Sequence, residues 1–322
     1  MRLMVTQSEI SAVIPTRNRP GPLARTLASL AEQSLCPAEL ILIDASNDDV
    51  SRGVASEWEA AFAAHGCALR WRAAVAVGAA VQRNQGVELA NCPIIAFFDD
   101  DIVFEADCLA RLRRALLSDP RIGGANAMIS NQRYFPPGLI SRSIFRLMAG
   151  RALDSYAGCL LGPAINLLPE DRENLPEIVP VEWLNTTCTL YRREALPDPP
   201  FAAFFTGYSL MEDVALSVRV SEKWKLANAR TARIFHDSQR GSHKSDVATL
   251  SEMELVNRHY VMTEVLGRRS PGDLTKLVTW ELFQLSLCAL RQRSGGPFWQ
   301  ILRGRWRAVR TICRLRAAPG IL

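Results

Sequence analysis

The feature that most constrains the fold is an apolar run, Pro93 to Phe98, that ends abruptly in Asp99, Asp100 and Asp101. A strand with one face in water alternates polar and apolar side chains, so an uninterrupted apolar run predicts a strand buried on both faces. The three acids then follow its carboxyl end, which is the edge where open α/β sheets bind ligands. Adjacent carboxylates need a positive counter-ion, and their hard oxygen atoms suit Mg²⁺ or Mn²⁺ better than zinc.

Two other interpretations of the aspartates stay open on this pattern alone. Acids after a strand often only end the strand and begin the next helix. The segment Asp99 to Val103 also fits the D-x-D-x-V pattern of haloacid-dehalogenase-like phosphatases, in which the first aspartate is a covalent nucleophile. No later glycine-aspartate motif completes the magnesium site of such a phosphatase, which weakens that interpretation.

Apolar runs alternate with segments of helical periodicity along the chain. We expect strands at residues 9–15, 39–44, 68–73, 122–129 and 225–235, and helices at 23–31, 50–64, 81–90 and 109–116. Such alternation predicts an α/β fold of right-handed βαβ units around a mostly parallel sheet. Thr16, Asp44 and the three aspartates would then meet at one edge of that sheet.

Cysteine usage and hydropathy restrict the class of protein. The eight cysteines never form a C-x-x-C pair, which predicts buried thiols in a reducing compartment and not a disulfide framework or a zinc site. The first residues lack the apolar core of a secretion signal. No apolar run reaches the roughly 20 residues of a transmembrane helix. We therefore expect a cytoplasmic protein.

Four short motifs follow one another in a recognisable order. They are Ala12 to Arg19 (AVIPTRNR), Leu42 to Ser46 (LIDAS), Gln82 to Gly86 (QRNQG) and Phe98 to Asp101 (FDDD). In this order and spacing they resemble the family 2 glycosyltransferases with the GT-A fold. The resemblance covers residues 9–130 and resumes at residues 182–240. It implies a nucleotide-diphospho-sugar transferase fold whose mostly parallel sheet is flanked by helices, here with a C-terminal helical extension.

The resemblance implies a site for a nucleotide-diphosphate sugar. Thr16 and Arg17 would lie beside the nucleoside. Asp44 would accept a hydrogen bond from the base, and Arg83 would reach the base or the diphosphate. The family often has a second acid after the position of Asp44, whereas this chain has Ala45, so the identity of the base stays open.

In this family the three aspartates form the D-x-D motif, which holds a divalent cation against the diphosphate. The resemblance implies Mn²⁺ or Mg²⁺ on Asp101, while Asp99 contacts the metal or the ribose and Asp100 lies between them at the sugar donor. His236, which follows the strand at 225–235, is expected to complete the metal shell or to contact the diphosphate. Residues 240–244 (RGSHK) would form a basic lid over the phosphates.

A second signature follows at Glu212 and Asp213. Leu210, Val214 and Val218 share one helical face, which places both acids in the first turn of a helix, where the helix dipole favours carboxylates whatever their role. In the family this Glu-Asp pair carries catalysis. The resemblance implies that Asp213 is the general base, accepting a proton from an acceptor hydroxyl during transfer with inversion, and that Glu212 orients the acceptor or Asp213.

The remaining stretches are less regular or strongly basic. Residues 133–181 lack periodicity, and we expect an irregular loop that recognises the acceptor or a surface insertion. No acid follows Glu281, whereas arginines recur at 291, 293, 303, 305, 307, 310, 314 and 316. With the aromatic residues among them, they predict amphipathic helices that either lie on an anionic membrane surface or pack on the catalytic domain. Nucleic acid is not expected, because no nucleic-acid-binding module accompanies the charge.

The resemblance implies a metal-dependent, inverting glycosyltransferase with a saccharide or lipid-linked acceptor, peripheral to the inner face of the cell membrane and active in surface polysaccharide assembly. Its catalytic domain would span residues 1–245, with residues 1–130 binding the nucleotide sugar and 131–245 the acceptor. Residues 246–322 would form a basic helical region. The alternatives are a phosphatase or nucleotidyltransferase, and a catalytically silent sugar-nucleotide-binding or scaffold protein.

Overall fold

The computed structural model describes residues 8–238, 246–291 and 296–317, which divide into two compact units. The sheet unit comprises Met1–Tyr134 and Leu168–Gln239. The helical unit comprises Phe135–Leu167 and Arg240–Leu322. Residues 135–167 thus group with the C-terminal helices, across the boundary at residue 245 that the sequence predicts.

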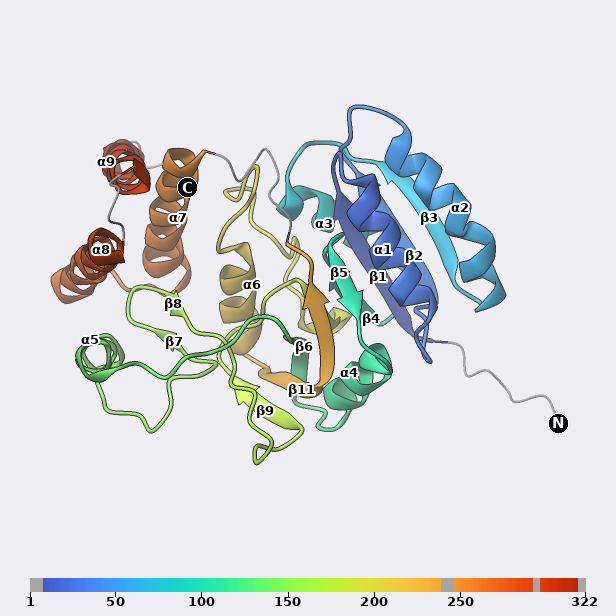
Figure 1. Ribbon diagram of the computed structural model, residues 1–322, viewed down its shortest axis with the longest axis horizontal. Helices are drawn as coiled ribbons and strands as arrows, with labels where there is room; N and C mark the ends of the chain where they lie inside the picture. The colour runs from blue at the N-terminus through green and yellow to red at the C-terminus, as the bar shows by residue number, and fades with distance from the viewer. Residues whose placement is uncertain (1–7, 239–245, 292–295, 318–322) are drawn as a thin grey trace. The chain divides into compact units, whose positions relative to one another are not determined.

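The sheet unit is built on one sheet with the strand order β3-β2-β1-β4-β10-β6-β11-β5, and β9 pairs with β11 (Figure 1). The strands are β1 (Ile10–Thr16), β2 (Glu39–Asp44), β3 (Ala68–Ala73), β4 (Ile94–Phe98), β5 (Ile102–Phe104), β6 (Ile122–Ile129), β9 (Ile178–Val181), β10 (Cys188–Arg192) and β11 (Lys225–His236). The first four are parallel, as predicted, and so are β6 and β11. The sheet as a whole is mixed, because β10 runs antiparallel to both of its neighbours, β4 and β6.

Helices cover both faces of this sheet. They are α1 (Pro20–Ala31), α2 (Val50–Ala64), α3 (Ala79–Leu89), α4 (Cys108–Leu117) and α6 (Glu212–Ser221), with a short 3-10 turn at Arg193–Ala195. Buried side chains of α1, α2 and α4 join Ile10, Ala12 and Ile14 of β1 in one hydrophobic cluster. Val13 points to the other face, where it meets Gly86 of α3. The period of two along β1 therefore separates two cores.

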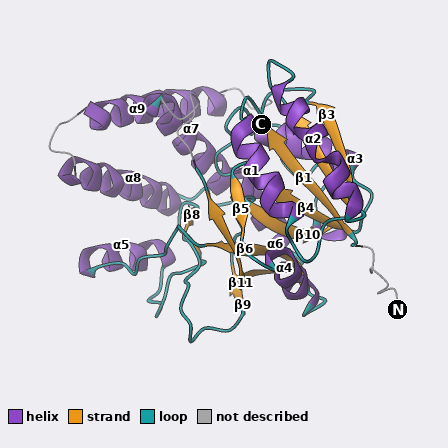
Figure 2. Cartoon of the chain, turned by 45° about the vertical axis from the view of Figure 1, so that its right-hand side comes forward, coloured by secondary structure: helices purple, strands orange, loops and turns teal. Residues whose placement is uncertain are grey.

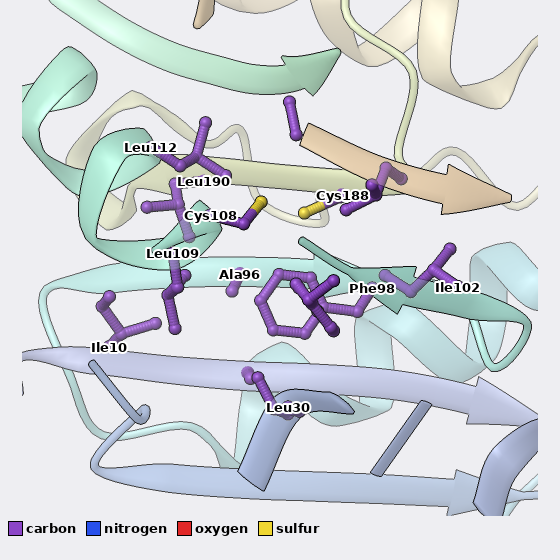
Figure 3. Close-up of a cluster of buried hydrophobic side chains, with 14 of the residues drawn as sticks. Ile10, Leu30, Ala96, Phe98, Ile102, Cys108, Leu109, Leu112, Cys188 and Leu190 are labelled. Carbon is purple, nitrogen blue, oxygen red and sulfur yellow. The ribbon is translucent and has the colours of Figure 1, made fainter. Parts of the chain in front are cut away.

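The larger core lies beneath the acidic end of β4. Phe98 stands beside Ile102, Cys108 and Leu109, with Leu30 approaching from α1 (Figure 3). Phe98 also packs edge-on against Phe104, with 5.0 Å between ring centroids. All five residues of β4 are buried, which confirms the prediction of a strand covered on both faces. This packing fixes the backbone from which the three aspartates emerge.

The helical unit contains α5 (Leu139–Ala149), α7 (Val247–Tyr260), α8 (Pro271–Arg291) and α9 (Gly296–Ala317), together with the short hairpin β7 (Leu160–Leu161) and β8 (Ile165–Asn166). A π-helical turn, Val261–Val265, follows α7. The expectation of an irregular loop at 133–181 was wrong for α5 and for these strands. Apolar residues of α5 do recur at helical spacing, at Ile140, Ile144, Leu147 and Met148, a signal that was missed among the prolines and glycines around it. No helix of the described residues has the length and apolar character to span a bilayer.

Four charged side chains hold α7, α8 and α9 together. Arg305 of α9 pairs with Glu254 of α7 and with Glu281 of α8, both at 2.8 Å. Arg258 of α7 pairs with the same two acids at 3.0 and 3.7 Å. Leu255, Met262, Leu277 and Ala308 form a small apolar cluster in this unit. The tail helices therefore pack on one another, and part of the arginine series is used internally.

Replacing Gly86 by alanine should destabilise the sheet unit. A methyl group there would overlap the side chain of Val13, and overpacking of this kind costs about 1–3 kcal/mol. Gly53, at the fourth residue of α2, has open space where a Cβ would lie, so Gly53→Ala should stabilise the protein by up to about 1 kcal/mol. Urea unfolding of both variants tests this, and Val13→Ala should rescue Gly86→Ala. Equal stability of the two glycine variants would contradict the packing.

Candidate functional site

The three aspartates occupy the turn between β4 and β5, next to the carboxyl ends of β1 and β4. Asp100 and Asp101 are buried, while Asp99 is partly exposed. The hydroxyl of Thr16, the last residue of β1, donates to Asp100 at 2.7 Å. Burial raises the pKa of Asp100 to about 7, although Arg19 and Thr16 both favour its charged form. Thr16 and the aspartates therefore meet, as the sheet topology predicts.

Arg19 supplies a counter-charge that sequence reasoning missed. Its guanidinium spans two carboxylates, at 2.6 Å from Asp100 and 2.7 Å from Asp101. The residue lies in the AVIPTRNR motif, at the N-cap of α1, one position before Pro20. The motif drew attention to Thr16 and Arg17, but the neighbours of Arg19 are distant in sequence. In the structure Arg17 is exposed and forms no hydrogen bond or ion pair with any described residue.

Arg83 of α3 joins the aspartates to the second acidic pair. It is buried, and its two terminal nitrogens donate to Asp99 at 2.7 Å and to Glu212 at 2.9 Å. Phe201 covers the guanidinium, whose carbon lies 5.8 Å from the ring centroid. Burial alone would lower the pKa of Arg83, but the surrounding acids, Asp99 first, raise it. One cation thus holds carboxylates that are more than a hundred residues apart in sequence.

Glu212 and Asp213 form the first turn of α6, as predicted. The preceding Met211 has a left-handed backbone with φ 74°, which turns the chain into the helix. Burial, followed for Glu212 by the charge of Asp213, raises the pKa values of both acids, and Arg83 opposes the shift. The charge of Asp99 also raises the pKa of Asp213. A carboxylate in these conditions is a better proton acceptor than a solvated one.

Three side chains are placed to hold a metal ion. Asp99, Asp101 and His236 each offer a ligand atom, and these atoms lie within 4.8 Å of one another. His236 ends β11, and its Nε2 lies 3.1 Å from Asp101. Burial would raise the pKa of Asp101, but the hydrogen bond and charge of His236, with Arg19, lower it to about 2. Two carboxylates and one imidazole fit Mn²⁺, which accepts both oxygen and nitrogen ligands.

Asp44 lies at the end of β2, on the same sheet edge. One of its oxygens accepts from the backbone amide of Ser46 at 2.8 Å, and the other from the indole of Trp71 at 3.0 Å. Trp71, on β3, is a neighbour that the sequence did not indicate. The indole orients this carboxylate at the edge of the sheet.

Tyr208 is a further residue that sequence reasoning missed. It lies between Gly207 and Ser209, which both have left-handed backbones, and it is partly exposed. Burial, and then the charges of Asp99, Asp101 and Glu212, raise its pKa to about 12. Its position five residues before Asp213 was the only sequence signal that it would lie near the acidic residues. The predicted basic lid at 240–244 lies outside the described residues.

The profile described as glycosyl transferase family 2 matches residues 11–197. The chain belongs to glycosyl transferase family 2. The match contains Thr16, Asp44, Arg83 and the aspartates, whereas Glu212 and His236 lie beyond it. The family 2 resemblance inferred from the four motifs is thereby confirmed.

Individual relatives agree with this family. Over 96 residues the chain is 32% identical to validoxylamine A glucosyltransferase of Streptomyces hygroscopicus subsp. limoneus, an alignment that covers 29% of this chain and 20% of that protein. The mannosyltransferase PcManGT from Pyrobaculum calidifontis, solved with GDP-Man and Mn²⁺, has a TM-score of 0.53 at 13% identity over 98% of this chain and 77% of its own. GalNAc-T7, solved with UDP, GalNAc and Mn²⁺, also reaches 0.53 at 15% identity, over 84% and 54%. These two structures show the shared GT-A fold.

Removing the cation of Arg83 should destabilise this family 2 protein. Arg83→Gln leaves the buried Glu212 and the partly exposed Asp99 without their partner, and breaking such a pair costs about 3–5 kcal/mol. Arg121→Gln, which breaks an exposed pair with Asp119, should change stability by less than about 1 kcal/mol. Chemical denaturation at neutral pH measures both. An Arg83 variant as stable as the Arg121 control would contradict a structural role for this bridge.

Proposed function

We propose that the protein transfers a sugar, with inversion at the anomeric carbon, from a nucleotide-diphosphate sugar to a saccharide or lipid-linked acceptor. The observation that carries the proposal is the convergence of two acidic groups on Arg83, with Asp99 on one side and Glu212 on the other. One group is suited to a cation and a diphosphate, and the other to a hydroxyl. PcManGT and GalNAc-T7, which share the fold, were solved with Mn²⁺ and with GDP-Man or UDP.

The cation, Mn²⁺ or Mg²⁺, would be held by Asp99, Asp101 and His236. When bound, it offsets the negative charge that grows on the diphosphate leaving group. The ion pairs of Arg19 with Asp100 and Asp101 keep this site charged and ordered before the ligands arrive. Thr16, Arg17, Asp44 and Asp100 contact the nucleoside or the sugar donor.

The chain's own acids carry out the proton transfer. Asp213 accepts the proton of the acceptor hydroxyl as that oxygen attacks the anomeric carbon, opposite the departing nucleotide. Glu212 keeps its ion pair with Arg83 and so positions α6. The sequence assigned Arg83 to the base or the diphosphate. Because both of its terminal nitrogens bind carboxylates, we assign it the role of aligning Asp99 with the catalytic helix.

The proposal also concerns location. A lipid-linked acceptor would bring the enzyme to the inner face of the cell membrane, in the assembly of a cell-envelope polysaccharide. The arginine-rich α9, with no acid after Glu281, supports contact with an anionic lipid surface.

Substitution of a metal ligand and substitution of the general base should have different effects. Asp101→Asn should abolish the thermal stabilisation that Mn²⁺ and a nucleotide sugar confer together, because one metal ligand is lost. Asp213→Asn should keep that stabilisation and lose about 10²- to 10⁴-fold in kcat. Thermal shift with a panel of nucleotide sugars, followed by product detection, measures both effects. Asp119→Asn, at an exposed turn, is the matched control.

The alternatives predict different results from the same proteins. A phosphatase would hydrolyse a simple phosphate ester and lose that activity in Asp99→Asn, with no response to a nucleotide sugar. A catalytically silent binding protein would bind the nucleotide sugar without turnover, unchanged in Asp213→Asn. Either outcome would refute sugar transfer by Asp213.

The pH dependence of transfer should reveal the environment of Asp213. Its carboxylate must be ionised to accept a proton, so kcat falls as the pH drops through its raised pKa. Arg83→Gln removes the cation that favours the ionised form of Asp213, so the acidic limb should move to higher pH. Glu222→Gln, at the exposed end of α6, should leave the limb unchanged. A limb that does not move in Arg83→Gln would exclude Asp213 as the group that titrates.

A further inference from the structure

One face of α9 exposes large apolar side chains. Trp299, Leu302, Trp306 and Val309 are spaced by three, four and three residues, so they share one side of the helix. The two tryptophans are 66% and 62% exposed, and Leu302 and Val309 are exposed as well. We call these four residues the tryptophan stripe. Soluble proteins seldom expose large apolar groups in a contiguous row without a partner for them.

The packing of the helical unit fixes the direction of this stripe. Gly304 and Ala308, on the opposite side of α9, are buried against α7, where a side chain at Gly304 would overlap the backbone of Ala248. The ion pairs of Arg305 with Glu254 and Glu281 hold the same orientation. Rotation of α9 to bury its tryptophans would break both contacts. The stripe is therefore a consequence of how the helices pack.

The arginines of α9 divide into internal and exposed groups. Arg305 is used in the ion pairs with α7 and α8. Arg303, Arg310 and Arg314 are exposed, and among the described residues none of them forms an ion pair with an acid. They follow one another at helical spacing beside the stripe, and the Arg310 guanidinium lies 5.7 Å from the Trp306 ring centroid. The apolar stripe thus has a positive border.

We propose that the tryptophan stripe and its three bordering arginines dock on an anionic lipid surface, with the tryptophans at the headgroup level. Amphipathic helices with Trp and Leu on one side and arginine beside them bind lipid interfaces in this way. A second copy of the chain fits less well, because a symmetric contact through the stripe would bring the arginines of both copies together. Val278 and Leu282 of α8, a helix that lies beside α9 (Figure 2), are exposed as well. This docking proposal rests on the proposed function only in so far as a lipid-linked acceptor would lie in the membrane.

Vesicle binding of the full chain tests the arginines. Wild-type protein should co-sediment with phosphatidylcholine vesicles containing phosphatidylglycerol and should release as salt increases. Arg303→Gln/Arg310→Gln/Arg314→Gln should weaken this partitioning at least about tenfold, since each arginine near such a surface contributes several-fold. Arg52→Gln/Arg114→Gln/Arg121→Gln removes the same charge from exposed positions of the sheet unit and should bind like the wild type.

Tryptophan quenching by lipids with brominated acyl chains tests the insertion. Wild-type fluorescence should be quenched in anionic vesicles. Trp299→Phe/Trp306→Phe should still bind but lose most of the quenching, whereas Trp299→Ser/Trp306→Ser should bind weakly. Circular dichroism and the melting temperature confirm that each variant is folded.

Several outcomes would overturn the proposal. They are equal binding to vesicles of phosphatidylcholine alone, equal loss of binding in both arginine triples, or wild-type quenching that persists in Trp299→Phe/Trp306→Phe. Absence of lipid binding with a concentration-dependent dimer that Trp299→Ser/Trp306→Ser disrupts would assign the stripe to a second copy. Failure of the proposed function is separate: a protein that binds vesicles but never turns over a nucleotide sugar refutes transfer and keeps the docking surface.

Discussion

The site depends on the buried guanidinium of Arg83. A buried cation is stable only with acids around it, and carboxylates removed from water need a cation in turn. Arg83 of α3 therefore depends on Asp99 at the end of β4 and on Glu212 at the start of α6, and both acids depend on Arg83. The same contact sets the two acidic groups at a fixed separation. If Arg83 were lost, both carboxylates would be left without their cation, which is why the structure of the site and its chemistry are coupled.

The sheet determines where those groups can meet. β1, β2 and β4 are parallel and end at one edge, which gathers Thr16, Asp44 and the aspartates. β10 then enters the sheet beside β4 in the opposite direction, and the backbone amide of Asp99 donates to the carbonyl of Thr187 just before β10. The segment around β10 is thereby attached to the N-terminal strands at the acidic turn. β10 lies between β4 and β6 in the middle of the sheet, so α6, the next α-helix along the chain, can reach Arg83.

The fold and most of the site follow from the sequence, for identifiable reasons. Strands β1, β2 and β4 are continuous apolar runs, and α2 and α4 have a clear period, so local patterns suffice. Arg19, Trp71 and Tyr208 were missed because their partners are brought together only by the tertiary fold. Helix α5 was missed although its apolar residues recur at helical spacing, because prolines and glycines surround it in the sequence. The antiparallel entry of β10 is not encoded in its own pattern.

We propose that the aspartates after β4 and the acids of α6 act on the same bound sugar donor. Diffraction from crystals soaked with Mn²⁺ and a non-reacting donor analogue, using the anomalous signal to locate the metal, tests it most directly. The expected result is a Mn²⁺ peak beside Asp101 and His236, with the anomeric carbon of the analogue facing the carboxylate of Asp213. A metal bound elsewhere, or an anomeric carbon turned away from Asp213, would contradict it.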